Sequence, residues 1–546
     1  MRTARLIAAA FLTAALLSGL PADAARWQWS VPVSGMKSDE TGQAPEAFLW
    51  VPQSCERLRA VLYTHQNMTE ELLVRDSTFR ARMEKIGVGI IYVAPGIDYK
   101  WDGTGSDCQF HFSKLMTDLA QVSGYSELER LPVIPFGHSA QATFPWNFAA
   151  WNPDRTLAVI SYHGDAPRTN LCGYGRENVE WGRTRNIDGI PGLMIEGEYE
   201  WWEARVNPAL SFRMMYPESC ISFLCDAGRG HFDLCPETIG YIARFIEKAM
   251  EQRMIGDAAP DGSTQMRTLD PARGWLCERW REGGKRRPAP APCTRYKGDP
   301  HDAFWYFDKE MASLTEERYA ATRGRRNQYV SIAQNGELLA YRPESHVKLS
   351  APFLPDEDGV TFRLEGVFVD STRTALSDDH AKGAVPRFCV VSGPCVQVSN
   401  GVFRLQFYCT GLSNRRRWNG ITLCVEADGD RRYKSAVQEI NVTLPNNSDG
   451  AAQSIDFPPI PDIHADREEV ILEATSDSGL PVSYYVKHGP AHIEGNRLLI
   501  SEIPPRAAFP IEVTVCAWQF GLPGRVQMAR PVERTFRILP SLPQTK

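Results

Sequence analysis

The stretch that decides the fold is Leu131-Pro132-Val133-Ile134-Pro135-Phe136-Gly137-His138-Ser139-Ala140-Gln141. Its first six residues are an apolar run, which is typical of a strand covered on both faces. Residues 141–150 are predicted to form a helix, so the chain must turn sharply at Ser139. Because Gly137 and Ala140 are small, they permit a tight turn that lifts the serine hydroxyl above the end of the strand. The sequence therefore predicts a strand, a turn with serine at its apex, and a helix.

Further apolar runs lie on both sides of this unit, separated by stretches with helical spacing of apolar residues. Near-continuous hydrophobicity over short runs, alternating with helices, predicts a mostly parallel sheet flanked by helices. This pattern extends from about residue 58 to residue 253. The predicted strands are 59–63, 88–93, 157–162, 192–196 and 221–224, and the clearest helices are 110–123 and 237–252.

Two polar side chains follow later strands of the predicted sheet. Glu200 comes three residues after Gly197, beyond the strand at 192–196, and His231 lies in a glycine-rich loop before the last helix. The carboxyl ends of parallel strands meet at one edge of a sheet, so we expect both near Ser139. A serine hydroxyl becomes a good nucleophile when a histidine takes its proton and a carboxylate orients that histidine. We predict Ser139 as nucleophile, Glu200 as acid and His231 as base, with Glu198 as the alternative acid.

An acyl-transfer site also needs N–H groups that stabilise the developing oxyanion. One is predicted to be the backbone N–H of Ala140, directly after the nucleophile. The other is expected from the polar loop after the strand at 59–63, with Gln66 or Asn67 as the donor.

Trp201 and Trp202 follow the predicted acid on a loop. An exposed aromatic ring there would suit stacking on a sugar ring or an aryl acyl group, so we predict that this pair binds substrate. No C-x-x-C pair occurs, and Asp233 near His231 is predicted to cap its loop. We therefore predict neither a metal nor a cofactor.

One residue departs from the strict nucleophile motif, because Gln141 stands where the motif closes with glycine. A larger side chain is unexpected where the helix and the strand approach closely.

At these residues the chain resembles the α/β-hydrolase superfamily, and within it the secreted esterases of the polyhydroxybutyrate-depolymerase and feruloyl- or acetyl-esterase kind. The resemblance covers about residues 50–252 and implies an eight-stranded sheet. It gives Ser139, Glu200 and His231 the roles of a catalytic triad. About 60 residues separate Ser139 from Glu200, which leaves little room for a cap domain, so we expect an open pocket that suits a bulky or polymeric ester.

The composition and the termini restrict the partners. The net charge is −6, without a long basic run, so neither a nucleic acid nor an anionic membrane surface is predicted as a partner. Arg2 and Arg5 precede an apolar run and the small-residue site at 22–24, which predicts an export signal and an extracytoplasmic protein. No later segment is apolar enough for a stable membrane span. Among the 13 cysteines we expect disulfides, and the candidates are Cys220/Cys225, Cys389/Cys395 and Cys409/Cys424.

The predicted organisation has five parts. They are a signal peptide at 1–24, an α/β-hydrolase catalytic domain at 25–253, a connecting segment with a short helix at 254–325, a β-sandwich-like domain at 326–455, and an immunoglobulin-like β-sandwich at 456–546. The last assignment follows from 474–486 and Gly489-Pro490-Ala491, which look like bacterial immunoglobulin-like repeats. That resemblance implies a spacer or anchor.

Three functions fit these observations. The first is an esterase that removes acyl groups from polysaccharides or oligosaccharides. The second is a serine peptidase or amidase, because one triad serves both bonds. The third is a non-catalytic surface-adhesion protein with a degenerate hydrolase domain, which Gln141 weakly favours and the complete trio of Ser139, Glu200 and His231 disfavours.

Overall fold

The computed structural model describes residues 27–38, 42, 44–97, 101, 108–170, 178, 180–200, 203–256, 259, 263–282, 287–409 and 419–541. The predicted export signal and the pair Trp201 and Trp202 lie outside the described residues.

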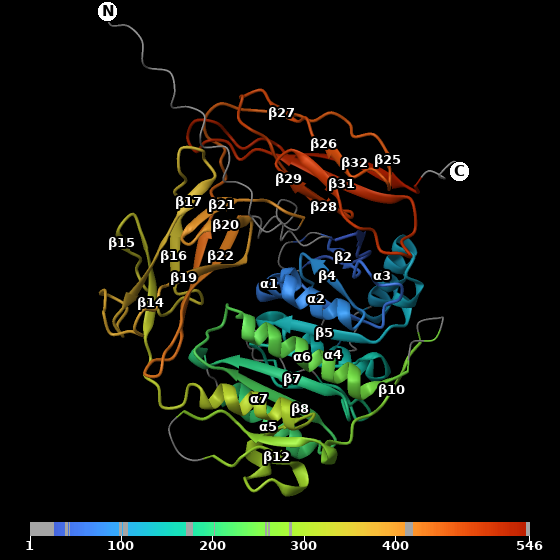
Figure 1. Ribbon diagram of the computed structural model, residues 1–546, viewed down its shortest axis with the longest axis vertical. Helices are drawn as coiled ribbons and strands as arrows, with labels where there is room; N and C mark the ends of the chain where they lie inside the picture. Colours follow the sequence, from blue (N-terminus) through green and yellow to red (C-terminus); the bar gives the residue numbers. More distant parts are fainter. Residues whose placement is uncertain are drawn as a thin grey trace, which may run out of the picture.

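The main sheet has eight described strands in the order β1-β2-β4-β3-β5-β6-β7-β8 (Figure 1). Strands β3 to β8 run parallel, and β2 joins β4 and β1 in antiparallel register. The predicted mostly parallel sheet is thus confirmed. Its strands are β1 (Trp29–Pro32), β2 (Glu46–Trp50), β3 (Ala60–His65), β4 (Val88–Ala94), β5 (Val133–His138), β6 (Val159–Tyr162), β7 (Pro191–Gly197) and β8 (Cys220–Asp226).

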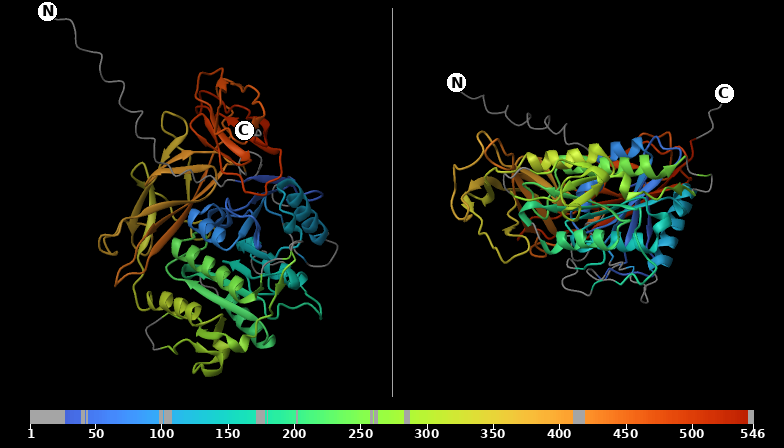
Figure 2. Two further views of the ribbon diagram at one scale, coloured as in Figure 1. Left: turned by 45° about the vertical axis from the view of Figure 1, so that its right-hand side comes forward. Right: turned by 90° about the horizontal axis from the view of Figure 1, so that it is seen from below.

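Helices cover both faces of this sheet, with α1, α2 and α6 on one face and α3, α4 and α5 on the other (Figures 1 and 2). Helix α6 begins with Pro236 at its first turn and buries Ile239, Ile242, Phe245 and Ile246, as the apolar spacing predicts. The helices are α1 (Thr69–Arg75), α2 (Ser77–Lys85), α3 (Cys108–Ser123), α4 (Phe144–Trp151), α5 (Glu203–Met215), α6 (Pro236–Arg253) and α7 (Lys309–Ala320).

The segment after α6, predicted as a connecting segment with a short helix at 254–325, contains that helix, α7, but also folds against the sheet. Strands β12 (Ala291–Pro292), β11 (Trp275–Glu278) and β13 (Ala303–Tyr306) form a small sheet that lies next to β8. Phe304, Tyr306 and Met311 are fully buried in the same core cluster as the central strands. Hydrophobic residues of this segment therefore belong to the core of the eight-stranded sheet.

The first β region follows α7 and lies beside the carboxyl ends of the parallel strands (Figure 1). Its largest sheet has the order β16-β23-β22-β19, and two three-stranded sheets complete it. The strands are β14 (Tyr329–Gln334), β15 (Glu337–Leu338), β16 (Leu349–Pro352), β17 (Thr361–Arg363), β18 (Glu365–Val369), β19 (Arg387–Ser392), β20 (Cys395–Ser399), β21 (Val402–Leu405), β22 (Gly420–Ala427) and β23 (Ala436–Thr443).

The C-terminal β region lies beside the β1 edge of the main sheet, next to α3 (Figure 2). Its Val513, Val515 and Phe536 share one apolar cluster with Trp29 of β1 and Leu115 of α3. The strands are β24 (Ile455–Asp456), β25 (Ile463–His464), β26 (Glu469–Ile471), β27 (Thr475–Ser476), β28 (Ser483–His488), β29 (Ala491–Glu494), β30 (Arg497–Ile500), β31 (Ile511–Trp518) and β32 (Val532–Leu539).

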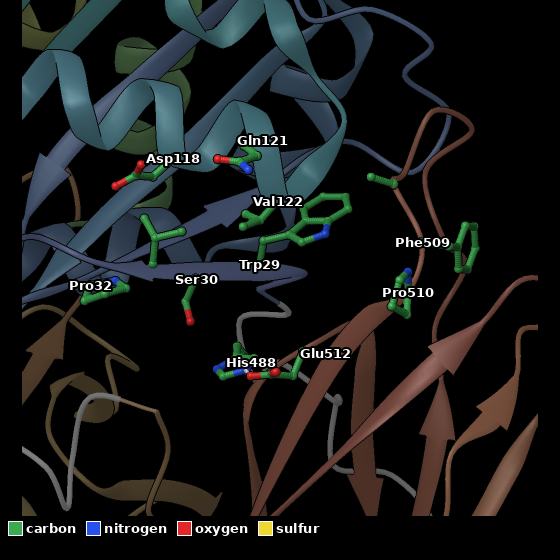
Figure 3. Close-up of a pocket in the computed structure, with 12 residues that line it drawn as sticks. Trp29, Ser30, Pro32, Asp118, Gln121, Val122, His488, Phe509, Pro510 and Glu512 are labelled. Atoms are coloured by element: carbon green, nitrogen blue, oxygen red, sulfur yellow. Dashed lines mark ion pairs between the residues drawn. The ribbon is translucent and has the colours of Figure 1, made fainter.

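A cavity of about 560 Å³ lies where this region meets β1 and α3 (Figure 3). Asp118, Gln121 and Val122 line it from α3, Trp29 lines it from β1, and the C-terminal region closes it with His488, Phe509, Pro510 and Glu512.

All twelve cysteines in the described part of the chain are free, so the suggested pairs are not joined. Cys220 and Cys225 lie five positions apart on β8, where side chains point to opposite faces. Cys389 and Cys395 belong to different sheets. The residue opposite Cys389 is Cys424, through the register of β19 and β22.

No helix among the described residues combines the length and the apolar character that a bilayer crossing requires.

Candidate active site

Ser139 stands at the end of β5, on a turn that its neighbours force to be tight. Its φ is +53°, in the left-handed region that non-glycine residues rarely adopt, and residues 139–141 form a single 3₁₀ turn before α4. A Cβ on Gly137 would lie 2.0 Å from the Gln141 carbonyl oxygen, so only glycine fits there. Ser139 is 8% exposed. The strained turn therefore presents the hydroxyl from a nearly buried residue.

His231 lies on the loop between β8 and α6 and reaches Ser139 directly. The distance between its Nε2 and the Ser139 Oγ is 2.8 Å. Its carbonyl oxygen accepts hydrogen bonds from His138 Nε2 at 2.8 Å and His163 Nδ1 at 2.7 Å. The carboxylate of Asp233 accepts from the Gly230 N–H at 2.9 Å, which is the predicted loop-capping contact. The histidine loop is thus fixed on both sides of His231.

Glu200 is the glutamate that the structure brings to this histidine. Its Oε2 pairs with His231 Nδ1, and its Oε1 lies 3.5 Å from His163 Nδ1. Glu198 has other partners: it accepts from the Gly228 N–H at 2.8 Å and pairs with Lys434 Nζ at 2.5 Å. Of the two candidates for the acid, only Glu200 contacts the imidazole.

Burial controls the protonation of the Glu200–His231 pair. It raises the pKa of Glu200 to about 8, although Arg205 and a hydrogen bond from Glu196 act in the opposite direction. Burial, followed by His346 and Arg205, holds the pKa of His231 well below its usual value. The imidazole is therefore neutral at neutral pH and able to accept a proton from Ser139.

Arg205 on α5 lies close to both Glu196 and Glu200. Its Nη1 lies 3.2 Å from Glu196 and 3.8 Å from Glu200, and the side chain is 5% exposed. Burial and the neighbouring Glu200 raise the pKa of Glu196 well above its usual range, so a protonated Glu196 can donate to Glu200. The sequence pattern marks neither residue as a partner of Glu200, because Arg205 lies on the following helix and Glu196 lies inside the preceding strand.

The predicted oxyanion donors differ in how they are placed. The N–H of Gln66 already donates to the Val93 carbonyl at 2.7 Å, as a continuation of the sheet. The side chain of Asn67 donates to the His138 carbonyl at 2.9 Å, which brings Asn67 next to the serine turn. Ala140 lies in that turn and is exposed. Ala140 and Asn67 thus lie at the serine turn, although the Asn67 side-chain amide, like the Gln66 N–H, already has an acceptor.

Gln141 fits because the close approach that the motif requires occurs elsewhere. A Cβ on Gly164 would lie 1.9 Å from the Ala142 Cβ, so the tight packing falls on that pair of residues. The Gln141 side chain hydrogen-bonds to His65 at the end of β3. The unexpected glutamine is thus a packed and hydrogen-bonded residue.

Within the described part of the chain, nitrogens of three histidines, His138, His163 and His231, lie within 4.8 Å of one another, as the ligands of a metal ion would. Burial lowers the pKa of each, which leaves all three neutral. One nitrogen of His138 and one of His163 contact the His231 carbonyl oxygen, while the two nitrogens of His231 face Ser139 and Glu200.

The first β region also reaches the site. Phe232, next to His231, is buried in a small cluster with Val391, Cys424 and Val437 of that region. The His346 ring packs against His231, with 5.0 Å between ring centroids. His231 is only 9% exposed, so the site is less open than we predicted from the short spacing between Ser139 and Glu200. Sequence analysis missed this cover because it comes from a region more than a hundred residues away.

The strand order, the turn at Ser139 after β5, Glu200 after β7 and His231 after β8 together define an α/β-hydrolase fold. The predicted fold class is confirmed: this fold is followed by all-β regions.

Comparisons with known proteins give similar solved structures but no closer relative. No protein-family model matches the sequence, and the comparison with curated proteins gives no match. The fluorophosphonate-binding serine hydrolase FphF of Staphylococcus aureus, in a substrate-bound form, is 12% identical over 40% of this chain and 97% of that chain, with a TM-score of 0.28. Est1E from Butyrivibrio proteoclasticus is 17% identical over 40% and 97%, with a TM-score of 0.26. The Pyrobaculum calidifontis esterase is 14% identical over 42% and 87%, with a TM-score of 0.29. Because these TM-scores are low, the likeness adds nothing about substrate or catalytic residues.

Proposed function

We propose that this chain is a serine hydrolase that cleaves carboxylic esters with Ser139, His231 and Glu200. The observation that carries the proposal is the 2.8 Å contact between Ser139 Oγ and His231 Nε2, with Glu200 on the other nitrogen of the ring. A nucleophile, a base and an orienting acid in one line are the parts that acyl transfer requires.

In the proposed reaction, Ser139 Oγ attacks the ester carbonyl carbon while its proton passes to His231 Nε2. The negative charge on the carbonyl oxygen is stabilised by the N–H groups of Ala140 and Asn67. The bond to the alcohol oxygen then breaks, and His231 gives its proton to that oxygen. A water molecule, deprotonated by His231, attacks the acyl-enzyme, and the acid leaves as Ser139 regains its proton. Glu200 stabilises the imidazolium in both halves.

The finer assignment is an exported esterase that removes acyl groups from polysaccharides or oligosaccharides. The export signal predicted at residues 1–24 supports an extracytoplasmic place, and the immunoglobulin-like spacer predicted at 456–546 supports a large substrate. Trp201 and Trp202, after the acid, are the proposed sugar-stacking residues.

Hydrolysis of 4-nitrophenyl acetate by the full chain tests the proposed chemistry. Ser139→Ala should lower kcat/KM by about three orders of magnitude or more, because the nucleophile is lost. Ser113→Ala, which changes an exposed serine on α3, is the matched control and should retain wild-type activity. A fluorophosphonate should phosphonylate Ser139 Oγ with loss of fluoride, so the protein gains the mass of the reagent minus HF. Equal rates in wild type and Ser139→Ala would contradict the proposal and favour the adhesion protein.

A substrate panel separates ester from amide hydrolysis. Acetylated, feruloylated and methyl-esterified oligosaccharides are compared with aminoacyl amides, at equal enzyme concentration. We expect turnover of one or more of the esters to exceed that of every amide. Faster turnover of the amides would favour the serine peptidase or amidase.

A further inference from the structure

One loop of the first β region reaches the proposed catalytic histidine. It connects β15 to β16 and carries His346. The ring of His346 packs edge-on against His231, with 5.0 Å between centroids, and against Phe232 at 4.8 Å. A residue from a separate β region thus lies against the base of the proposed triad.

The loop is braced, so His346 is held in place. Lys348 Nζ donates to the carbonyl oxygens of Pro343 at 2.9 Å and Ser345 at 2.6 Å, and the Lys348 N–H donates to Glu439 at 3.3 Å. Val347 packs against the cluster around Phe232. Both neighbours of His346 in the sequence are therefore fixed, through carbonyl contacts on one side and apolar packing on the other.

The His346 side chain remains exposed while the triad beneath it is nearly buried. Ser139 and His231 are 8% and 9% exposed. Partial burial and the positive charges of Lys348 and Arg205 lower the pKa of His346. A neutral imidazole offers one hydrogen-bond donor and one acceptor beside an aromatic ring.

We propose that His346 is a specificity-determining residue that contacts the alcohol part of the ester, and that it favours hydroxyl-bearing alcohols such as sugars. This inference rests on the proposed function. His231 must give its proton to the oxygen of the departing alcohol, so that group passes next to the His231 ring, where His346 lies. A donor, an acceptor and an apolar ring edge match the hydroxyl and C–H groups of a sugar.

Two acetate esters isolate this contact. 4-Nitrophenyl acetate and an acetylated xylo-oligosaccharide form the same acetyl-Ser139, so the ratio of their kcat/KM values reports only on the alcohol part. In His346→Ala, the ratio of the oligosaccharide value to the nitrophenyl value should fall about tenfold. His346→Gln keeps a donor and an acceptor and should show a smaller fall. Glu344→Ala, an exposed residue of the same loop, should keep the wild-type ratio.

The outcomes separate this inference from the function on which it rests. If the wild type cleaves both esters and the two His346 variants keep the ratio within twofold, His346 only packs on His231 and the inference is wrong. A parallel fall of both values has the same meaning, because a displaced His231 affects every ester. If the wild type cleaves neither ester, or Ser139→Ala equals the wild type, the proposed function fails and this inference fails with it.

Discussion

Glu200 and Glu198 lie two positions apart after β7, yet they have different partners and we expect them to have different roles. Glu200 pairs with His231, whereas Glu198 pairs with Lys434 of the first β region. We expect Glu200→Gln to lower kcat/KM for 4-nitrophenyl acetate at least a hundredfold, because an amide cannot stabilise the imidazolium. Glu198→Gln should lower it less than tenfold. A larger loss in Glu198→Gln would transfer the role of the acid to Glu198.

The buried pair of Glu200 and His231 sets the pH dependence. Burial raises the pKa of Glu200 to about 8, and a protonated carboxyl cannot support the imidazolium. The value of kcat/KM should therefore rise with pH, with an apparent pKa near 8 that belongs to the pair. The measurement is kcat/KM from initial rates across about pH 6 to pH 9, and a value that does not change over this range would contradict the prediction.

Arg205 provides a second test of the same electrostatics. Its charge lowers the pKa of Glu200 and of His231, so its removal should raise both. In Arg205→Met the rising limb of the profile should move to higher pH. Lys85→Met, which removes an exposed charge at the end of α2, should leave the limb in place. An unmoved limb in Arg205→Met would show that Arg205 acts only in packing.

Among individual residues, the sequence predicts those that follow the end of a predicted strand in the expected order along the chain. Ser139, Glu200 and His231 follow three different strands, and parallel strands bring their carboxyl ends to one edge. Three other residues could not be predicted. The place of Arg205 depends on how α5 is rotated, and that of His163 on a strained turn with φ of +49°. His346 comes from a distant loop, between β15 and β16.

Among the elements, the junction between β5 and α4 is the most constrained. A Cβ on Gly137 would lie 2.0 Å from the Gln141 carbonyl oxygen and 2.6 Å from its carbon. Gly137→Ala should therefore displace the serine turn and lower kcat/KM at least a hundredfold. Gly240→Ala, on α6, meets no atom closer than 3.8 Å, so it should retain activity and gain up to about 1 kcal/mol of stability. Kinetics and urea unfolding of both variants test this; a fully active Gly137→Ala would contradict it.

The parallel strands were predictable because each is an apolar run bounded by a helix or a loop. Strands β1 and β2 were not predicted; Ser30 and Pro32 interrupt the apolar residues of β1, and β13 was missed because Pro, Arg and Gly dominate the segment before it. The helix expected from Gln141 begins instead at Phe144, since residues 139–141 are taken up by the 3₁₀ turn.

Across the whole molecule, both β regions contribute to the hydrolase region that they flank. The first pairs Lys434 with Glu198 and Glu426 with Arg229, on the loops that carry Glu200 and His231. The C-terminal region shares an apolar cluster with α3 and β1. Sequence patterns describe each region by itself, so contacts between residues hundreds of positions apart could not be predicted from them.

Arg506 makes the attachment of the C-terminal region testable. Its guanidinium contacts both carboxylate oxygens of Glu127, at 3.1 and 3.0 Å, and lies 5.3 Å from the centre of the Tyr125 ring. Glu127 is fully buried, whereas Arg506 is 38% exposed. Water therefore weakens the attraction between the two charges, but it does not reach the Glu127 carboxylate to solvate it. Arg506→Ala leaves a buried carboxylate without its cation and should lower the free energy of unfolding by about 2 kcal/mol.

Arg537 provides the matched control, because it pairs with Asp462 on the exposed side of the same region. Arg537→Ala should lower the free energy of unfolding clearly less than Arg506→Ala does, because exposed ion pairs contribute little to stability. Urea unfolding followed by tryptophan fluorescence measures both variants. Glu127 also accepts a hydrogen bond from the Leu58 N–H at 3.0 Å, just before β3. Loss of the Arg506 side chain should therefore destabilise the hydrolase region and the C-terminal region together, in one unfolding transition. An early separate transition confined to the C-terminal region would mean that it is attached more loosely than its shared core implies.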